Sequence, residues 1–193
     1  MTSKDGHPEN DIRLGGGFGK WARIQHPPHD LAHVMLSDEA RMHIADLLTE
    51  QRYAGALDAH HLRPRSRLLL IGPSSAWRMA LAGAIARALG LPFLVVDYDS
   101  LITSYAGEAG AKIGVLLNRL AGQPCVLLLN EAETILPGPP SGASDIIPLT
   151  VLAIGNMGVR TILVGSTNRP YMLDPAIRQS FDLEIKMPIV AGA

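Results

Sequence analysis

The sequence predicts an α/β protein in which helices cover both faces of a parallel sheet. From residue 67 onward, short apolar runs alternate with segments of helical periodicity. The runs are continuously apolar, which is typical of strands buried on both faces of a parallel sheet. The composition agrees, because 47% of the residues are hydrophobic and 18% are charged, which favours a globular chain over a disordered one.

Each apolar run is separated from the next by turn residues and a helical segment. The strands are expected at 68–71, 93–96, 125–129, 161–164 and 183–187. The helices between and around them are expected at 79–89, 107–120, 146–154 and 175–180. A further helix precedes the first strand, because Ser37 is a suitable N-cap and acidic residues follow it. The pattern predicts a five-stranded parallel sheet.

The N-terminal part differs in composition from the rest of the chain. Residues 1–30 are rich in glycine, histidine, proline and charged residues. We therefore expect a flexible N-terminal arm at 1–35, an α/β core at 36–188 and a short tail at 189–193.

The composition also excludes several kinds of partner and site. The formal net charge of −1 gives no electrostatic reason to expect nucleic acid or an anionic membrane as a partner. Cys125 is the only cysteine, which excludes an internal disulfide and a multi-cysteine zinc site. The apolar stretch 79–96 carries Arg87 and is broken at Gly90, so it does not predict a membrane span. No signal peptide is visible, and we expect a cytoplasmic protein.

The histidines do not predict a metal site. His29 and His33 are four positions apart, but Pro27 and Pro28 favour an extended chain rather than a helix that would align them. Solvated or packed histidines are the simpler interpretation, and no metal ligand is predicted.

Three polar clusters follow predicted strands. They are 72–79, Asn130 with Glu131, and 166–168. Ligands of parallel sheets bind at the carboxyl ends of the strands, so these clusters are expected to converge at one edge.

The sequence resembles the AAA family of ATPases over roughly residues 38–188. Four pieces occur in the order of the family: 63–73 is similar to the lead into Walker A, 100–108 to the pore-loop segment, 127–131 to Walker B, and 165–170 to sensor 1. The resemblance implies a P-loop NTPase-like three-layer α/β/α sandwich. It also implies ATP or ADP with magnesium as the ligand, if any nucleotide binds. No cofactor is certain.

The phosphate loop departs from the pattern G-x-x-x-x-G-K-[ST]. The eight positions of the window are Gly72, Pro73, Ser74, Ser75, Ala76, Trp77, Arg78 and Met79. Trp77 replaces the glycine that allows close approach of phosphate, and its side chain needs other space. Arg78 keeps the charge of the lysine but not its shape. Met79 offers magnesium a soft thioether where the family has a hydroxyl.

The other nucleotide motifs are altered in part. Asn130 is neutral at the Walker B position where the family has an aspartate that helps to hold magnesium. Glu131, which in the family polarises the attacking water, and Asn168, which orients it, are both retained. These two residues are interpreted as vestigial or weak catalytic residues. The alternative is that they are polar residues satisfying the loop backbone at strand ends.

Two further parts of the family pattern are affected near the C-terminus. The positions of the usual arginine fingers are occupied by Gln179 and Ser180, while Arg178 is displaced by one residue, about 100° on a helix. The family's C-terminal helical lid also has no counterpart here, and we expect it to be absent.

Two segments are candidates for partner contacts. Tyr105 and Gly107 match the aromatic–apolar–glycine pore loop with which the family grips polypeptide, although the simpler interpretation is that Tyr105 caps the start of the next helix. The segment 146–154 is almost entirely apolar, so it is either deeply buried or docks onto a partner.

These observations favour a degenerate AAA-type domain, a pseudo-ATPase that acts as a scaffold or regulatory subunit with weak or no ATP hydrolysis. Its expected partners are proteins, either active AAA subunits or further copies of itself. The alternative is an active AAA protein with an atypical phosphate loop, with Arg78 as the phosphate clamp and Glu131 as the base, coupled to polypeptide remodelling. A third interpretation is a polypeptide-handling or peptidase-linked module that works through Tyr105. Several losses in one site would leave little hydrolysis, which is why the first interpretation is preferred.

Overall fold

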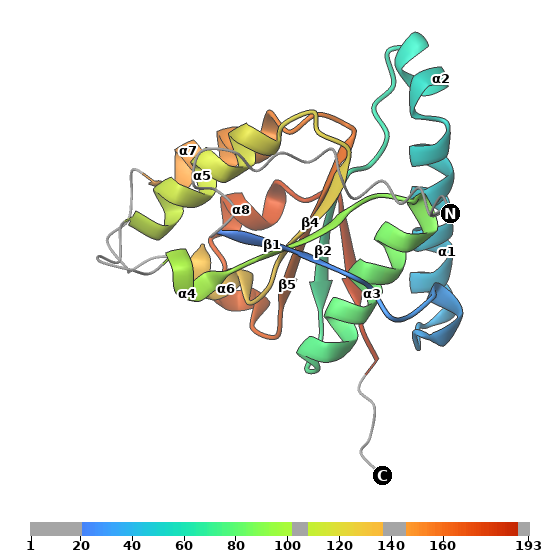
Figure 1. The fold of residues 1–193 in the computed structure, drawn as a ribbon, viewed down its shortest axis with the longest axis horizontal. Coiled ribbons are helices and arrows are strands. Elements are labelled where there is room, and N and C mark those ends of the chain that lie inside the picture. Colours follow the sequence, from blue (N-terminus) through green and yellow to red (C-terminus); the bar gives the residue numbers. More distant parts are fainter. Residues whose placement is uncertain (1–20, 102–107, 137–145, 189–193) are drawn as a thin grey trace, which may run out of the picture.

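The computed structural model describes residues 21–101, 108–136 and 146–188, and a central sheet carries helices on both faces (Figure 1). The strands are β1 (Ala22–Gln25), β2 (Arg67–Ile71), β3 (Phe93–Val96), β4 (Cys125–Leu129), β5 (Thr161–Thr167) and β6 (Leu183–Lys186). The α-helices are α1 (Asp38–Arg52), α2 (Ala54–Ala59), α3 (Ser75–Leu89), α4 (Tyr98–Leu101), α5 (Glu108–Leu120), α6 (Ala132–Ile135), α7 (Ile146–Gly155) and α8 (Pro175–Gln179). Two 3-10 turns are η3 (Leu31–His33) and η4 (Pro170–Met172).

The strands are ordered β1-β3-β4-β5-β2-β6 in one sheet. All neighbours pair in parallel except β1 and β3, which are antiparallel. The five predicted strands are thus confirmed as β2 to β6, and the parallel crossovers between them pass through helices as expected. Within the described part of the chain, no helix has the length and apolar character needed to cross a membrane.

The edge strand β1 corrects the prediction of a five-stranded sheet and of a flexible arm reaching residue 35. Residues 22–25 pair with β3 from Ala22 opposite Val96 to Gln25 opposite Phe93. Ala22 and Val34 are buried, at 1% and 2% exposure, so this segment belongs to the core. Apolar periodicity does not reveal this strand, because an edge strand of four residues lacks the continuous apolar run of an interior strand.

Alternation along the strands divides the core into two layers. Leu69, Leu127 and Leu163 point toward the layer that contains α5, α7 and α8. Their neighbours Leu68 and Leu128 point toward the layer that contains α1 and α3. Both layers are closed to solvent, which confirms the three-layer α/β/α sandwich, and Figure 1 shows the two groups of helices on opposite sides of the sheet.

The helix after β2 begins at Ser75, earlier than the predicted start at residue 79. Ser74 is its N-cap, and the Ser74 hydroxyl accepts a hydrogen bond of 3.3 Å from the backbone N–H of Trp77. Gly90 ends the helix in the left-handed conformation, with φ of 64°, which a glycine adopts without steric cost. The early start places Ser75, Ala76, Trp77 and Arg78 of the phosphate-loop window on the first turn of α3, and Met79 on the next.

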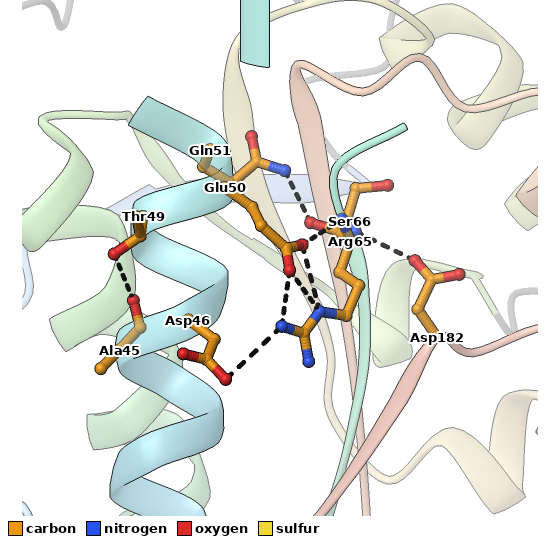
Figure 2. Close-up of polar contacts among 8 residues, drawn as sticks. All are labelled: Ala45, Asp46, Thr49, Glu50, Gln51, Arg65, Ser66 and Asp182. Carbon is orange, nitrogen blue, oxygen red and sulfur yellow. Dashed lines mark hydrogen bonds and ion pairs between the residues drawn. The ribbon is translucent and has the colours of Figure 1, made fainter. Parts of the chain in front are cut away.

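Charged groups form hydrogen bonds and ion pairs at the amino ends of β2 and β6, and Figure 2 shows those that involve Arg65 and Ser66. The Glu50 carboxylate on α1 accepts hydrogen bonds from the backbone N–H of Arg65 and from its guanidinium, at 2.9 Å and 2.6 Å. Gln51 donates to the Arg65 carbonyl at 2.7 Å, and Asp182 accepts from the backbone N–H of Ser66 at 3.0 Å. The contact with Arg65 lowers the pKa of Glu50. These bonds join α1 to the start of the sheet.

Candidate functional site

The three polar clusters do converge at the carboxyl edge of the sheet. The pairing of β2 with β5 places Ile71 opposite Thr167, directly before the loop at Gly72. The pairing of β4 with β5 places Leu129 opposite Gly165, directly before Asn130. The topology therefore brings the loop, the end of β4 and the end of β5 together, as predicted for a ligand site of this fold.

Gly72 is required by packing at this edge. Its N–H donates to the Thr167 carbonyl at 3.1 Å, which ties the loop to β5. A Cβ added at Gly72 would lie 2.6 Å from the Cβ of Met187. The close approach of Met187 is thus sufficient to explain this glycine, whether or not a phosphate lies nearby.

The loop residues after Gly72 are partly open to solvent. Pro73 and Ala76 are exposed, while Ser74 and Ser75 are half-buried. Trp77 and Met79 are also half-buried, and both pack against the core layer that contains α1 and α3. The side chain of Trp77 is therefore accommodated in part by packing against the hydrophobic core.

Arg78 is the most unusual residue of the loop. It is 1% exposed, and its Nη1 donates to the carbonyl of Gly72 in the same loop. Its Nε is buried without a hydrogen-bond partner. Burial lowers the pKa of the guanidinium, because the charged form loses its hydration, while the carboxylates of Glu133 and Glu131 oppose the shift. The side chain is thus turned inward onto its own loop.

Glu133 is a site residue that the sequence analysis missed. It lies in the first turn of α6, is 6% exposed, and its Oε2 is buried without a hydrogen-bond partner. The only sequence signal is a second acidic residue two positions after Glu131, and such spacing does not reveal burial. Its carboxylate, like that of Glu131, opposes the lowering of the pKa of Arg78 by burial.

Asn130 and Glu131 differ in how they are held. The Asn130 Oδ1 accepts a hydrogen bond of 2.8 Å from the hydroxyl of Ser166, a contact that the sequence did not predict. Glu131 is exposed and has a left-handed backbone, with φ of 53°, at the N-cap of α6. Such a conformation is uncommon for a residue with a side chain and costs about 1 kcal/mol or more.

The sensor-1 segment begins inside β5, whose last residue is Thr167, and continues beyond the strand. Asn168 is exposed, and the hydroxyl of Thr167 accepts a hydrogen bond of 2.9 Å from the backbone N–H of Arg169. The Asn168 side chain is therefore accessible at the same edge as the loop, where the sequence analysis placed it.

Arg178 is paired within its own chain. Its Nε and Nη2 contact the two oxygens of Glu184 at 2.5 Å and 2.7 Å, and this contact lowers the pKa of the glutamate. Gln179 is exposed and Ser180 donates its hydroxyl to the Ile177 carbonyl at 2.6 Å. The guanidinium is thus already engaged in a bidentate contact.

The predicted partner segments have different outcomes. Tyr105 and Gly107 lie outside the described residues. On α7, Ile154 is fully buried, whereas Leu149 and Leu152 are 64% and 59% exposed. These leucines line a hollow of about 290 Å³ together with Val115 of α5. The helix is thus both a core element and an exposed apolar surface.

A search for metal ligands among the described residues finds no group of three or more histidine, cysteine or acidic side chains that could hold a metal ion. Cys125 is buried, and burial raises the pKa of its thiol to about 12. It therefore stays in the neutral thiol form, as expected of a small buried hydrophobe.

Comparison with known proteins identifies this arrangement. Residues 68–189 match the family model described as ATPase family associated with various cellular activities (AAA). The chain is 31% identical over 161 residues to the uncharacterised AAA family ATPase y4kL of Sinorhizobium fredii, covering 81% of this chain and 49% of that protein. It is 28% identical to the peroxisomal ATPase pex6 of Schizosaccharomyces pombe, covering 72% of this chain and 16% of that protein.

Among solved structures, the AAA domain of FIGL-1 matches the fold with a TM-score of 0.66 at 18% identity. The match covers 86% of this chain and 57% of that chain. The chain spans about half the length of y4kL and a smaller share of the peroxisomal ATPase.

Proposed function

The chain belongs to the AAA family of ATPases, and on that premise we propose that it is a pseudo-ATPase domain acting as a scaffold or regulatory subunit. The observation that carries the proposal is the inward orientation of Arg78. A phosphate-binding side chain has to present its charge to the ligand, but this guanidinium is buried and donates to the carbonyl of Gly72.

The residues present fit a magnesium nucleotide poorly. Met79 packs against the core and supplies sulfur where a hard cation needs oxygen. Asn130 has no charge, and its side-chain oxygen already accepts a bond from Ser166. No hydrolytic step is therefore assigned to this site, and ATP or ADP with magnesium is a weak ligand at most.

Nucleotide binding tests this proposal. Calorimetric titration with magnesium-ATP and magnesium-ADP should show no binding in the micromolar range, and phosphate release should remain at background. The variant Trp77→Gly with Arg78→Lys and Met79→Thr rebuilds the standard loop and should gain binding. Micromolar affinity together with turnover in the unaltered protein would contradict the proposal.

An active ATPase with an atypical loop is the second candidate. It is supported by Glu131, which is exposed and held in a strained conformation at the ligand edge, and by the accessible Asn168. In that case Glu131→Gln would abolish phosphate release and preserve nucleotide binding. Equal background rates in both proteins would remove this candidate.

The expected partners are proteins, either active AAA subunits or copies of this chain. The exposed leucines of α7 support a protein contact, because a patch with Leu149, Leu152 and Val115 is costly to leave in water. Replacing Leu152 by Asp should reduce any association of the chain with itself or with a family member. The association is measured as the mass of the particles in solution by light scattering. An unchanged mass distribution would exclude this surface. A cytoplasmic location and gripping of polypeptide by Tyr105 remain predictions.

A further inference from the structure

A polar hollow lies at the amino edge of the sheet, opposite the phosphate loop. Its volume is about 200 Å³, and its lining includes the segment 63–67, Gly155 at the end of α7, Met157, Val159 and Asp182. Small-molecule sites typically enclose about 300–1,000 Å³. The hollow is therefore of a size for one side chain rather than for a nucleotide or another free metabolite.

The charged residues that line this hollow are mostly arginines. Arg63, Arg65 and Arg67 contribute three guanidiniums, and Asp182 contributes the only carboxylate among the described lining residues. Asp182 is already engaged, because it accepts hydrogen bonds of 3.0 Å from the backbone N–H groups of Ser66 and Arg67 and from the Arg67 Nε. The field in the hollow is therefore positive and favours an anion.

Two of the guanidiniums are held in place by carboxylates of this chain. Arg65 is bound by Glu50 at 2.6 Å and lies 3.8 Å from Asp46, and both acidic residues are on α1 (Figure 2). Arg67 is bound by Asp182 through its Nε and Nη2. The Nη1 atoms of both arginines have no hydrogen-bond acceptor among the described residues. A ligand would meet groups that are already ordered, which lowers the entropic cost of binding.

Arg63 and Ser66 line the hollow with polar groups that lack a partner. Arg63 is exposed and forms no hydrogen bond or ion pair with the described residues. Ser66 is only 6% exposed, and its hydroxyl has no hydrogen-bond partner in the described part of the chain either. A guanidinium and a hydroxyl are both donors to a carboxylate, and a charge-assisted bond to a guanidinium is the stronger kind.

We propose that this hollow binds an acidic segment of a protein partner, with Arg63 receiving an aspartate or glutamate carboxylate. A carboxylate presents two oxygens to the planar guanidinium, so it can accept two parallel hydrogen bonds. Met157 and Val159 add apolar groups to the lining, which suits a peptide better than free phosphate. The proposal goes beyond the pseudo-ATPase assignment and does not depend on it, because the hollow lies away from the phosphate loop.

Peptide binding followed by NMR tests this proposal. The probe is the capped peptide acetyl-Leu-Glu-Glu-Leu-amide, titrated into the isotope-labelled chain, and its glutamine counterpart is the matched control. The glutamate peptide should shift the backbone amide signals of 63–67 and 155–159, and the glutamine peptide should not. Arg63→Gln should weaken binding about three- to fivefold, since the contact is charge-assisted but exposed to solvent.

The control variant is Arg41→Gln, which removes an equal charge from an exposed position near the other end of α1 from Glu50. It should leave the affinity unchanged. Equal affinities for the two peptides, or the same loss in Arg41→Gln as in Arg63→Gln, would overturn the proposal. Tighter binding of inorganic phosphate than of the glutamate peptide would also overturn it, because the hollow would then be a site for free anions.

A substitution at Gly155 provides a second test in which no arginine is changed. Gly155 lines the hollow, and a Cβ added there meets nothing within 4 Å. Gly155→Glu supplies a carboxylate from the chain itself and should weaken the glutamate peptide about fivefold or more relative to Gly155→Gln, which has the same shape without the charge. Equal affinities in these two variants would mean that the hollow does not recognise charge. Failure of the pseudo-ATPase assignment is distinguishable, because it appears as magnesium-ATP turnover in the unaltered protein.

Discussion

The two edges of the sheet handle their charged residues in opposite ways. At the amino edge, Arg65 is bound by Glu50, and Asp182 accepts from the backbone of Ser66 and from the guanidinium of Arg67. At the carboxyl edge, Arg78 and Glu133 are buried with unused polar atoms, and Glu131 has a left-handed backbone. Paired charges at the amino edge favour stability, whereas buried polar atoms without a partner and backbone strain are typical of sites where function and stability conflict.

The difference separates two explanations for retained motif residues. Gly72 belongs to the phosphate loop but is explained by its contact with Met187, so its presence says little about nucleotide. Arg78 and Glu133 have no comparable packing explanation, because a buried charge is replaced at little cost by an apolar residue of similar volume. A functional account of this edge therefore starts from these two buried charged residues and not from the glycine.

The largest expected effect is at Gly72. Gly72→Ala places a Cβ 2.6 Å from that of Met187, and relief requires movement of the backbone next to β6. We expect a loss of about 2–3 kcal/mol in the free energy of unfolding, measured by urea denaturation. Gly55→Ala is the matched control, because nothing lies within 4 Å of the added atom. If Gly72→Ala changed the free energy of unfolding no more than Gly55→Ala does, packing against Met187 would not explain Gly72, and phosphate binding would be the remaining explanation.

The next effect concerns the paired edge. Glu50→Ala leaves the Arg65 guanidinium and its backbone N–H without their main acceptor, at side chains that are 30% and 28% exposed. We expect a loss of about 1–2 kcal/mol in the free energy of unfolding, since the contact is charge-assisted but partly solvated. Asp46→Ala is the control, because its contact with Arg65 is longer, at 3.8 Å, and more exposed. Equal losses would show that bidentate geometry is not important here.

The same contact makes stability depend on pH. The pKa of Glu50 is lowered from its usual 4.5, so folding favours the ionised carboxylate. Its stabilisation is fully present above the unfolded pKa and is lost as the pH falls through the folded one. Urea midpoints of the unaltered protein should therefore fall below about pH 4.5, and those of Glu50→Gln should fall less steeply. If the urea midpoints of the two proteins fell equally with pH, Glu50 would make no contribution to the pH dependence of stability.

The smallest effect is a gain at the strained edge. Glu131→Gly removes the steric cost of φ at 53° and should raise the free energy of unfolding by up to about 1 kcal/mol, seen as a higher melting temperature. His61→Gly is the matched control, because His61 has φ of 58° in the loop before β2. A smaller gain at 131 than at 61 would measure what the Glu131 side chain contributes to stability.

Periodicity was a good guide to the interior of the fold. The five apolar runs are β2 to β6, and the helices expected between them are present. Strand β1 was not predicted, because four residues at the edge of a sheet lack the continuous apolar run of an interior strand. Helix α3 begins earlier than predicted because Ser74 caps it, and a polar cap leaves no trace in the apolar periodicity. Local pattern thus predicts what the core dictates, and it is weakest where a sheet ends.

The site was predictable in position but not in detail. The order of the strands placed the loop, Asn130, Glu131 and Asn168 at one edge, and the pairing of β5 with β2 and β4 brings them there. The inward rotamer of Arg78 and the burial of Glu133 depend on tertiary packing, which no spacing rule encodes. The roles assigned to these residues stay predictions until nucleotide binding is measured.

The edge strand β1 has a consequence for the order of folding. Arg23 pairs with Asp97 across 74 positions of the chain, so β1 has to wait until β3 exists before it can dock. Its register needs a neighbour that is already in place, whereas α3 forms from local contacts. Assembly is therefore expected to run from the centre of the sheet outward, with the first strand in the sequence among the last to be added. Amide exchange should be fastest at that same strand, because the last element to dock is the first to open.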